Sequence, residues 1–212
     1  MEKKDVTIMF ADESHCQYAG HICKLIYESA LVRGTGIAKR SPDYIASKII
    51  RGNAVVAMHG DRLVGFSYIE CWGHGDFVAT SGLIVDPEYR HLGLATDIKQ
   101  KTFELTRRKF PYAKIFSITT SLPVMKMNCK LGYVPVTFSE LTDDKEFWDG
   151  CKGCCNYDIL ERNQRRMCLC TGMLYDPKTK ITDEVKKHHP VIPYLMKSKT
   201  VFKNIMLWKR TK

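Results

Sequence analysis

The chain has 212 residues, of which 44% are hydrophobic and 26% are charged, and its formal net charge is +10. This length suits one well-buried domain with an extension, but not two ordinary domains. The longest apolar stretches have the length of a strand, well under the roughly 20 residues of a membrane-spanning helix. The first residues lack the apolar core and cleavage site of a signal peptide, so we expect a cytoplasmic protein that binds no membrane. The positive charge favours an anionic partner, either nucleic acid or a phosphorylated cofactor.

The beginning of the chain predicts a strand, two helices and a hairpin. Ile22, Ile26 and Ala30 recur at helical spacing and indicate an amphipathic helix. Ser41-Pro42 is typical of a helix start, with Ser41 as the N-cap. The turn over residues 59–62 joins two apolar runs of strand length. We therefore expect a strand over 6–11, helices over 19–30 and 41–50, and antiparallel strands over 53–58 and 63–72.

The following segment predicts further strands and helices. Asp86-Pro87 breaks a long strand, and Gly132 ends a short helix. We expect strands over 77–85, 114–120, 133–138 and 167–175, and helices over 95–109 and 124–131. The pattern indicates an α+β fold with one mixed sheet. A soft boundary near residue 175 separates a domain over 1–175, with a cysteine-rich insertion at about 139–166, from a basic C-terminal extension over 176–212.

The loop before the helix over 95–109 carries the most informative motif, Arg90-His-Leu-Gly-Leu-Ala95. A loop that opens a helix directly after a strand directs several backbone N–H groups and the positive end of the helix dipole at one point, which suits a pyrophosphate. Gly93 and Ala95 keep the backbone approachable. The letters R-x-x-G-x-A alone are weak evidence, because glycine-containing helix starts are common. An ordinary strand-to-helix turn is the alternative.

The segment resembles the acyl-CoA-binding motif of the GCN5-related N-acetyltransferase (GNAT) superfamily, (Gln/Arg)-x-x-Gly-x-(Gly/Ala). As in that family, a strand ending in Val-Asp-Pro-Glu-Tyr-Arg precedes it. The order of strands and helices over residues 6–138 is also similar, and Lys130-Leu-Gly-Tyr133 resembles the end of the family's fourth helix. The resemblance implies a mostly antiparallel central sheet, flanked by helices and splayed between strands 4 and 5.

The resemblance also implies the reaction and the cofactor site. It implies an N-acyltransferase in which a primary amine attacks the thioester of acetyl-CoA or another acyl-CoA, such as succinyl-CoA. By position, backbone groups of Leu83 and Val85 would bind the pantetheine, and the pyrophosphate would lie against Arg90, His91, Leu92, Gly93, Leu94, Ala95 and Thr96. We expect a small-molecule amine as acceptor, no nucleic acid as partner, and leave a homodimer open.

Two positions depart from the family pattern. The glutamate that many GNAT enzymes carry on the fourth strand is Ala79 here, and the tyrosine often used as general acid on the fourth helix is Asn128. Three other residues near the expected cleft are candidates for catalysis: Glu70, His74 and Tyr133. Each has a structural alternative, since Glu70 and His74 could be solvent-facing turn residues and Tyr133 a core residue. A water-relayed base is a further alternative.

The basic loop over residues 32–40 follows the first helix, in the region that forms a wall of the acceptor site in GNAT enzymes. Arg33, Lys39 and Arg40 could clamp a carboxylate, and arginine could do so with two hydrogen bonds. A solvated loop is the alternative. The chain also resembles bacterial GNAT proteins linked to N-acylglutamate formation, which makes an amino acid such as glutamate the candidate acceptor.

Nine cysteines without a signal peptide favour reduced thiols or a metal site over disulfides. Cys151 and Cys154 give C-x₂-C, and Cys168 and Cys170 give C-x-C on the last predicted strand, where they would face one side. Four such thiolates could form a structural zinc site with no open position for catalysis, so we assign no metal to the active site. Ordinary buried thiols are the alternative.

The C-terminal extension supports a rival interpretation. From Lys186 it is basic, with Tyr194, Phe202 and Trp208 interleaved. This composition could bind RNA or a protein, which would make the chain a nucleic-acid- or protein-binding module with a zinc knuckle on a catalytically weak GNAT scaffold. The alternative is an extension that packs its apolar residues onto the domain and leaves its lysines in solvent.

Overall fold

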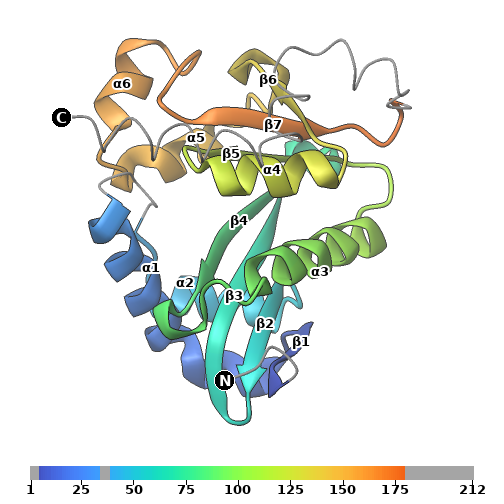
Figure 1. Cartoon of the computed structure of the whole chain (residues 1–212). Helices are drawn as coiled ribbons and strands as arrows, with labels where there is room; N and C mark the ends of the chain where they lie inside the picture. The colour runs from blue at the N-terminus through green and yellow to red at the C-terminus, as the bar shows by residue number, and fades with distance from the viewer. Residues whose placement is uncertain (1–4, 34–38, 180–212) are drawn as a thin grey trace, which may run out of the picture.

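A central β-sheet organises the molecule in the computed structural model, which describes residues 5–33 and 39–179 (Figure 1). The strand order is β1-β2-β3-β4-β5-β7-β6, with β4 and β5 parallel and the other neighbours antiparallel. The strands are β1 (Thr7–Phe10), β2 (Ala54–His59), β3 (Arg62–Trp72), β4 (Phe77–Val85), β5 (Lys114–Thr119), β6 (Val134–Val136) and β7 (Thr171–Tyr175). The predicted α+β fold with a mostly antiparallel sheet is therefore confirmed.

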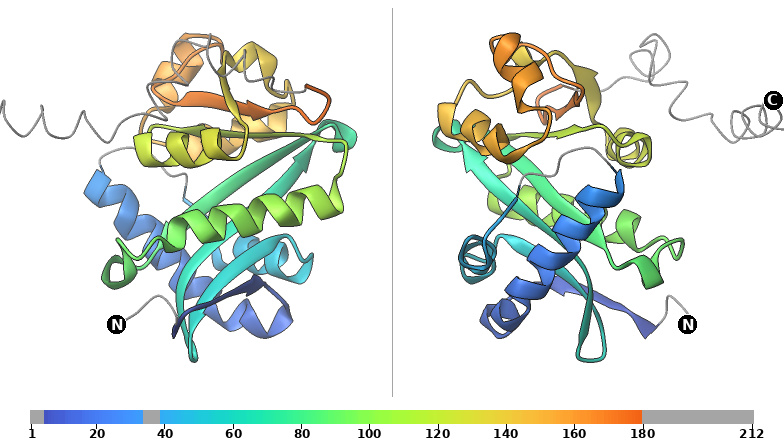
Figure 2. Two further views of the ribbon diagram at one scale, coloured as in Figure 1. Left: turned by 45° about the vertical axis from the view of Figure 1, so that its right-hand side comes forward. Right: turned by 90° about the vertical axis from the view of Figure 1, so that its left-hand side faces the viewer.

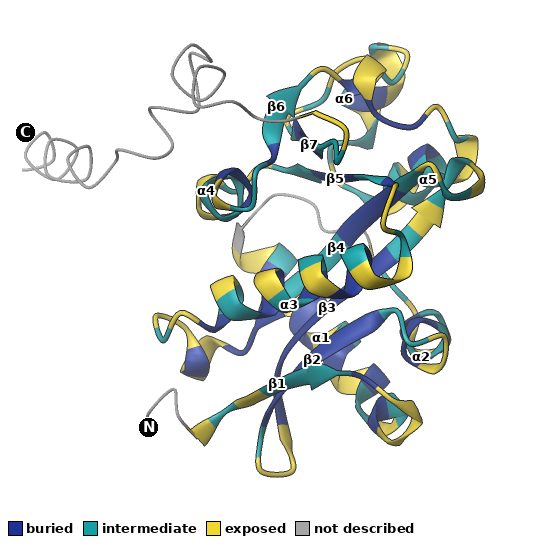
Figure 3. Cartoon of the chain, turned by 90° about the vertical axis from the view of Figure 1, so that its right-hand side faces the viewer, coloured by how far each residue is buried: buried dark blue, intermediate teal, exposed yellow. Residues whose placement is uncertain are grey.

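Helices cover both faces of the sheet (Figure 2). They are α1 (Ala19–Arg33), α2 (Pro42–Ile50), α3 (Leu94–Lys109), α4 (Leu122–Lys130), and the short α5 (Lys145–Asp149) and α6 (Tyr157–Arg162). Apolar residues of α1 and α2 pack against Ala54 and Val56, whereas those of α3 pack against Val55 and Ala57. Alternate residues of β2 thus face opposite layers, as the period of a strand requires. The inner strands are buried on both faces, while α3 keeps an exposed outer side (Figure 3).

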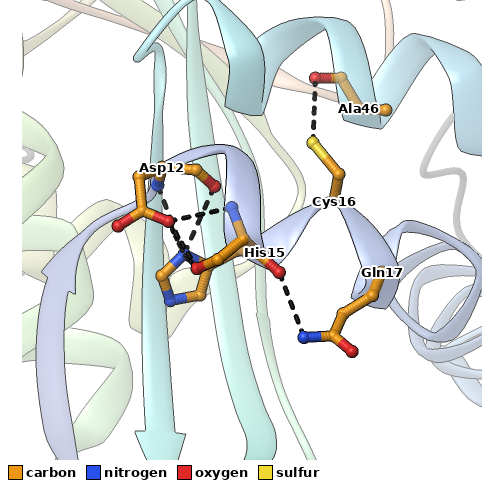
Figure 4. Close-up of polar contacts among 6 residues, drawn as sticks. Asp12, His15, Cys16, Gln17 and Ala46 are labelled. Atoms are coloured by element: carbon orange, nitrogen blue, oxygen red, sulfur yellow. Dashed lines mark hydrogen bonds and ion pairs between the residues drawn. The ribbon is translucent and has the colours of Figure 1, made fainter.

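The turn between β1 and α1 is fixed by a capping arrangement (Figure 4). The Asp12 carboxylate accepts from the Ser14 N–H at 3.0 Å, and His15 Nδ1 accepts from the Asp12 N–H at 3.2 Å. Such reciprocal bonds satisfy N–H groups that a helix start leaves without partners. In the same turn, Cys16 Sγ lies 4.0 Å from the Ala46 carbonyl of α2. The turn thereby links the first two helices into one wall.

Strands β4 and β5 separate soon after they begin (Figure 1). They pair only from Phe77 and Lys114 to Ala79 and Phe116. The predicted splay between the fourth and fifth strands is therefore confirmed. The separation leaves an opening beside the C-terminal half of β4, where no strand of the described residues pairs with β4 on the side of β5.

A β-bulge shapes β4 along this opening. Gly82 and Leu83 lie opposite the single residue Ser67 of β3, because the register shifts between Phe66 and Tyr68. Gly82 has a φ of 66°, and a Cβ atom there would come within 2.5 Å of the Tyr68 ring. Glycine is required at this position both by the left-handed backbone and by the close ring.

Two predicted elements end differently in the structure. The last strand covers 171–175 rather than 167–175, because Met167 and Leu169 are exposed and β6 pairs only with Gly172 to Leu174. The insertion over 139–166 folds into the 3₁₀ turns Phe138–Glu140 and Gly150–Gly153 and helices α5 and α6. Trp148 and Leu160 of this segment pack with Phe116 into a separate core cluster. In the described part of the chain, no helix has the length and apolar character needed to cross a bilayer.

We expect Gly82→Ala to destabilise the protein. The substitution forces an L-residue into the left-handed region, which costs about 1–2 kcal/mol, and adds a clash with the Tyr68 ring. The midpoint of urea-induced unfolding should fall accordingly. Gly20→Ala is the matched control, since Gly20 is exposed on α1 with open space around its Cα, and this change should leave the midpoint equal or raised. Equal midpoints for Gly82→Ala and the wild type would contradict the assignment of the bulge.

Candidate functional site

A cavity of about 490 Å³ occupies the opening between β4 and β5. Its walls come from strands β3, β4 and β5, from α3 through Lys99, from the start of α4, from the segment around α2, and from the cysteine-rich insertion. The residues that the following paragraphs use are Arg40, Tyr44, Tyr68, Glu70, Ala79, Thr80, Leu83, Lys99, Ser117, Cys151, Cys154, Cys168 and Cys170. This is the place where a ligand inserted between the two strands would lie.

The loop at the C-terminal end of β4 has the geometry of an anion site. Gly93 is the N-cap of α3 with a φ of 82°, and His91 also has a positive φ of 67°. Among the described residues, no backbone carbonyl accepts a hydrogen bond from the N–H groups of residues 91–95. Those donors and the helix dipole remain available to a negatively charged group. The Arg90 side chain is exposed beside them.

The segment that leads into this loop is firmly held. Arg62 Nη2 lies 2.9 Å from the Asp86 carboxylate and 2.7 Å from the Glu88 carboxylate. Tyr89 is buried, and its hydroxyl lies 2.7 Å from His59 Nδ1. These contacts fix the end of β4 against the β2–β3 hairpin, so the loop has a defined position. Leu83 lines the cavity, and Val85 is buried at the end of β4, directly before the loop.

Glu70 is the sequence candidate that the structure places in the cavity wall. It lies within β3 and is largely buried, so the alternative of a solvent-facing turn residue is wrong for it. Its carboxylate forms an ion pair with Lys48 of α2, whose amine also lies 4.4 Å from the centre of the Tyr44 ring. The pair therefore joins α2 to β3 at the edge of the cavity.

His74 and Tyr133 lie outside the cavity lining. His74 is exposed in the 3₁₀ turn Gly73–Gly75, where the solvent-facing alternative describes it correctly. Tyr133 is 1% exposed and packs with Ile115 and Met173 as a core residue. Burial raises the pKa of its phenol. Of the three predicted catalytic candidates, Glu70 lines the cavity, and His74 and Tyr133 do not.

The two positions at which the sequence departs from the GNAT pattern have different surroundings. Ala79 lies in the cavity wall and is the last residue of β4 that pairs with β5, so this position faces the cavity but supplies no carboxylate. Asn128 is fully buried, and its Nδ2 donates to Ser117 Oγ at 2.8 Å. Asn128 supports β5 from behind and does not line the cavity.

Arg40 is the residue of the basic loop that reaches the cavity. Its Nε donates to the Tyr68 hydroxyl at 3.0 Å, and its guanidinium lies 5.1 Å from the Tyr44 ring centre. Burial lowers the pKa of Arg40, but interactions with Tyr68, Tyr44 and Glu70 outweigh it and raise the pKa, so the charge persists. Lys39 is exposed, 5.4 Å from the ring centre of Tyr27 and outside the lining. The side chain of Arg33 and residues 34–38 lie outside the described part of the chain.

The four cysteines of the predicted knuckle all line the same cavity. Within the described ranges, no group of three or more His, Cys, Asp or Glu side chains is arranged to hold a metal ion. Cys168 and Cys170 precede β7 and do not lie on a strand, so the expectation that a strand would turn both to one side is wrong. Burial raises the pKa of Cys151 to about 11 and that of Cys170 to about 12, so both stay protonated at neutral pH.

Sequence reasoning missed Lys99, which lines the cavity from α3. The residue is 3% exposed, and its amine donates to Thr80 Oγ1 at 2.6 Å. Burial lowers the pKa of Lys99 to about 7. The helical period could have revealed this position, because Lys99 is spaced by four from Ala95 and by three from the buried Thr102.

Solved acetyltransferases have the same arrangement of strands and helices. N-acetylglutamate synthase from Neisseria gonorrhoeae, complexed with coenzyme A and N-acetyl-glutamate, matches with a TM-score of 0.58 at 17% identity. The match covers 82% of this chain and 35% of that one, so the chain spans about a third of the length of the Neisseria enzyme. A protein from Mycobacterium tuberculosis in complex with CoA matches with a TM-score of 0.57 at 16% identity, over 80% of this chain and 98% of that one.

A third match is the diaminobutyrate acetyltransferase EctA from Paenibacillus lautus, in complex with its substrate L-2,4-diaminobutyric acid and coenzyme A. Its TM-score is 0.55 at 9% identity, over 84% of this chain and 98% of that one. No protein-family model and no curated protein matches the sequence. At these identities the likeness shows the fold alone.

We expect Lys99→Met to stabilise the protein most at and below neutral pH. The amine has a pKa of about 7 in the folded chain and 10.5 as its ordinary value, so between these values the unfolded chain binds more protons. Wild-type stability should therefore rise with pH across this window, by up to about 1.4 kcal/mol per pH unit. Methionine has no ionisable group, so the variant should lack this contribution to the pH dependence of stability.

Melting temperatures measured from pH 6 to pH 10 would check this expectation. The melting temperature of Lys99→Met should exceed that of the wild type most near pH 6. This difference should shrink as the pH rises from the folded pKa of about 7 toward the ordinary value of 10.5. A constant difference at every pH would show that the amine of Lys99 does not titrate in this range.

Proposed function

We propose that this chain, which has the GNAT fold, is an N-acyltransferase that moves an acyl group from acyl-CoA to a primary amine. The observation that carries the proposal is the opening between β4 and β5, where a cavity reaches Leu83 and β4 then leads on to the start of α3. Among the described residues, no backbone carbonyl accepts from the N–H groups at that helix start. The solved structures of this fold described above contain CoA. An extended thioester ligand suits this arrangement, because it has an anionic end for the loop and a reactive end for the cavity.

The cofactor would lie along β4. Its pyrophosphate would accept hydrogen bonds from the N–H groups of residues 91–95 and face the Arg90 guanidinium. Its pantetheine would follow Leu83 and Val85 as an added strand on the unpaired edge of β4. The bulge at Gly82 leaves a backbone group of β4 outside the β3 ladder. An N–H freed in this way could stabilise the oxyanion that develops when the thioester carbonyl is attacked.

The acceptor would enter on the side of α2. Arg40 and Glu70 line this wall with opposite charges, which suits a molecule with a carboxylate and an amine. Arginine binds carboxylates through its planar donor fork, and Glu70 could accept a proton from the ammonium group through water. This charge pattern supports an amino acid such as glutamate as acceptor. For the acyl group, acetyl-CoA and succinyl-CoA are the two donors to compare.

The rival role in binding nucleic acid or protein depends on the extension over 176–212. Only residues 176–179 of this extension belong to the described part of the chain. No observation on the described residues favours that role over acyl transfer.

We expect Gly93→Asp to weaken acetyl-CoA binding relative to Gly93→Asn. Both side chains tolerate a left-handed φ, so the pair isolates the charge that aspartate adds beside the diphosphate. Coulomb repulsion at about 5 Å with an effective dielectric near 20–80 amounts to roughly 1–3 kcal/mol, or about 5- to 150-fold in affinity. Isothermal titration of both variants gives the ratio. Equal affinities would place the diphosphate elsewhere, and no binding by the wild type at millimolar acetyl-CoA would refute the proposed function.

We expect Arg40→Gln to raise the KM for a carboxylate-bearing acceptor. Losing a hydrogen bond to a charged group costs about 1.5–3 kcal/mol, which corresponds to about 10- to 100-fold in KM. The KM for acetyl-CoA should stay nearly constant, since the loop over 90–96 is untouched.

A panel of amino acids and polyamines, with release of free CoA as readout, would identify the acceptor. Lys39→Gln is the matched control, because this neighbouring cation lies outside the cavity. The same KM change in both variants would contradict a specific role for Arg40.

A further inference from the structure

Lys99 lines the cavity, and neither the cofactor loop nor the acceptor wall uses it. Lysine is almost never fully buried unless it is paired, because removing an ammonium from water is costly. Within residues 5–33 and 39–179, the amine of Lys99 bonds to Thr80 Oγ1 and lies 5.2 Å from the centre of the Tyr133 ring. No carboxylate of those ranges forms an ion pair with it. A cationic group kept at such a cost inside a cavity is a candidate for a role in chemistry.

The amine lies where the two strands part. Thr80 directly follows Ala79, the last residue of β4 that pairs with β5. The Thr80 hydroxyl can also donate to the Phe116 carbonyl, 3.4 Å away on β5. Lys99 and Thr80 therefore bridge α3, β4 and β5 at the narrow end of the opening. Under the proposed function, the reactive end of the thioester lies in this gap.

The amine also lies on the cofactor side of the sheet. It belongs to α3, the same helix whose first turn faces the expected pyrophosphate. Glu70, in contrast, pairs with Lys48 of α2, which covers the opposite face (Figure 2). A group on the side of α3 is placed to meet the sulfur of the thioester, and a group on the side of α2 is placed to meet the acceptor amine.

We propose that Lys99, as an ammonium, protonates the CoA thiolate when it leaves, either directly or through the Thr80 hydroxyl. The proposal rests on the proposed function. The neutral amine of the acceptor attacks the carbonyl carbon, a C–N bond forms, the C–S bond breaks, and the electron pair of that bond goes to sulfur. Lys99 gives its proton to the sulfur, while the nitrogen of the new amide loses one to water or Glu70. Solvent then restores the proton on Lys99.

The surroundings of Lys99 fit this role. Thr80 faces it from β4, and Tyr133 faces it from the segment after α4. Burial keeps the Tyr133 phenol neutral, and burial is also what lowers the pKa of Lys99, to about 7. An acid with such a pKa gives up its proton readily near neutral pH. A thiolate formed nearby would be stabilised by the ammonium that it is about to deprotonate.

The test is the ionisation of the thiol of bound CoA, which requires no acceptor. The ultraviolet absorbance of thiolate is followed against pH for the CoA complex, and the same titration of the desulfo-CoA complex is subtracted. The protein's own thiols cancel in this difference. An ammonium within about 4–6 Å lowers the pKa of a thiol by about 1–3 units, and the thiolate in turn keeps the amine protonated, so the two groups titrate as a pair. The thiolate of bound CoA should therefore begin to form about one pH unit or more below that of free CoA in the wild type. In Lys99→Met the lowering should disappear.

Lys101→Met is the matched control. It removes a lysine from the same helix with the same change in net charge, but Lys101 is ion-paired to Glu104 and does not line the cavity. This variant should keep the lowered thiol pKa. The proposal is overturned if the thiol of bound CoA ionises at the same pH in Lys99→Met as in the wild type, or is not lowered in the wild type. Failure of the wild type to bind CoA or desulfo-CoA would instead refute the proposed function.

An activity readout separates acid catalysis from a structural bridge, once the panel has given an acceptor. Loss of a general acid should lower kcat by about 100-fold or more in Lys99→Met, with the KM for acetyl-CoA nearly unchanged. A change in both KM values with a constant kcat would indicate that Lys99 only positions α3 against β4, and would overturn the proposal.

Discussion

The short pairing of β4 with β5 is the constraint on which the site depends. Three residue pairs hold the strands together, and beyond Ala79 and Phe116 the backbone of β4 pairs with no strand on that edge in the part of the chain that the structure describes. A longer ladder would close the cavity, and no ladder would separate the two halves of the sheet. The bulge at Gly82 adds to this constraint, because the absent side chain leaves room for the Tyr68 ring, whose hydroxyl holds Arg40. The bulge at Gly82 thus shapes the edge of β4 and helps to position Arg40.

The opening divides the cavity between two sides of the sheet. Helix α3 supplies Lys99 and the turn that we propose binds the pyrophosphate, whereas Glu70, Lys48 and Arg40 cluster around α2. The positions that in GNAT enzymes often hold a glutamate and a tyrosine carry Ala79 and Asn128 here, and the Asn128 side chain donates to Ser117. In the proposed reaction, Glu70 and Lys99 take over these tasks from positions on different elements, each on the side of the substrate that it serves.

Local patterns made much of the fold predictable. Apolar periodicity gave the order of strands and helices, and the loop with Gly93 could be recognised because its glycine and its place after a strand are adjacent in sequence. The wall proposed to bind the acceptor could not be predicted as well, because tertiary packing of α2 on β3 decides that Glu70 faces the cavity and His74 does not. Lys99 was missed because a lysine on an amphipathic helix normally faces solvent, although its spacing from Thr102 placed it inward.

Two cysteines of the cavity wall have a consequence for the fidelity of the proposed acyl transfer. A thiolate close to an activated thioester would compete with the acceptor and capture the acyl group on the protein itself, since thiolates are stronger nucleophiles than thiols. Burial raises the pKa of Cys151 and Cys170 to about 11 and about 12, which keeps both as unreactive thiols at neutral pH. In the proposed reaction, these two side chains can therefore line the cavity without capturing the acyl group at neutral pH.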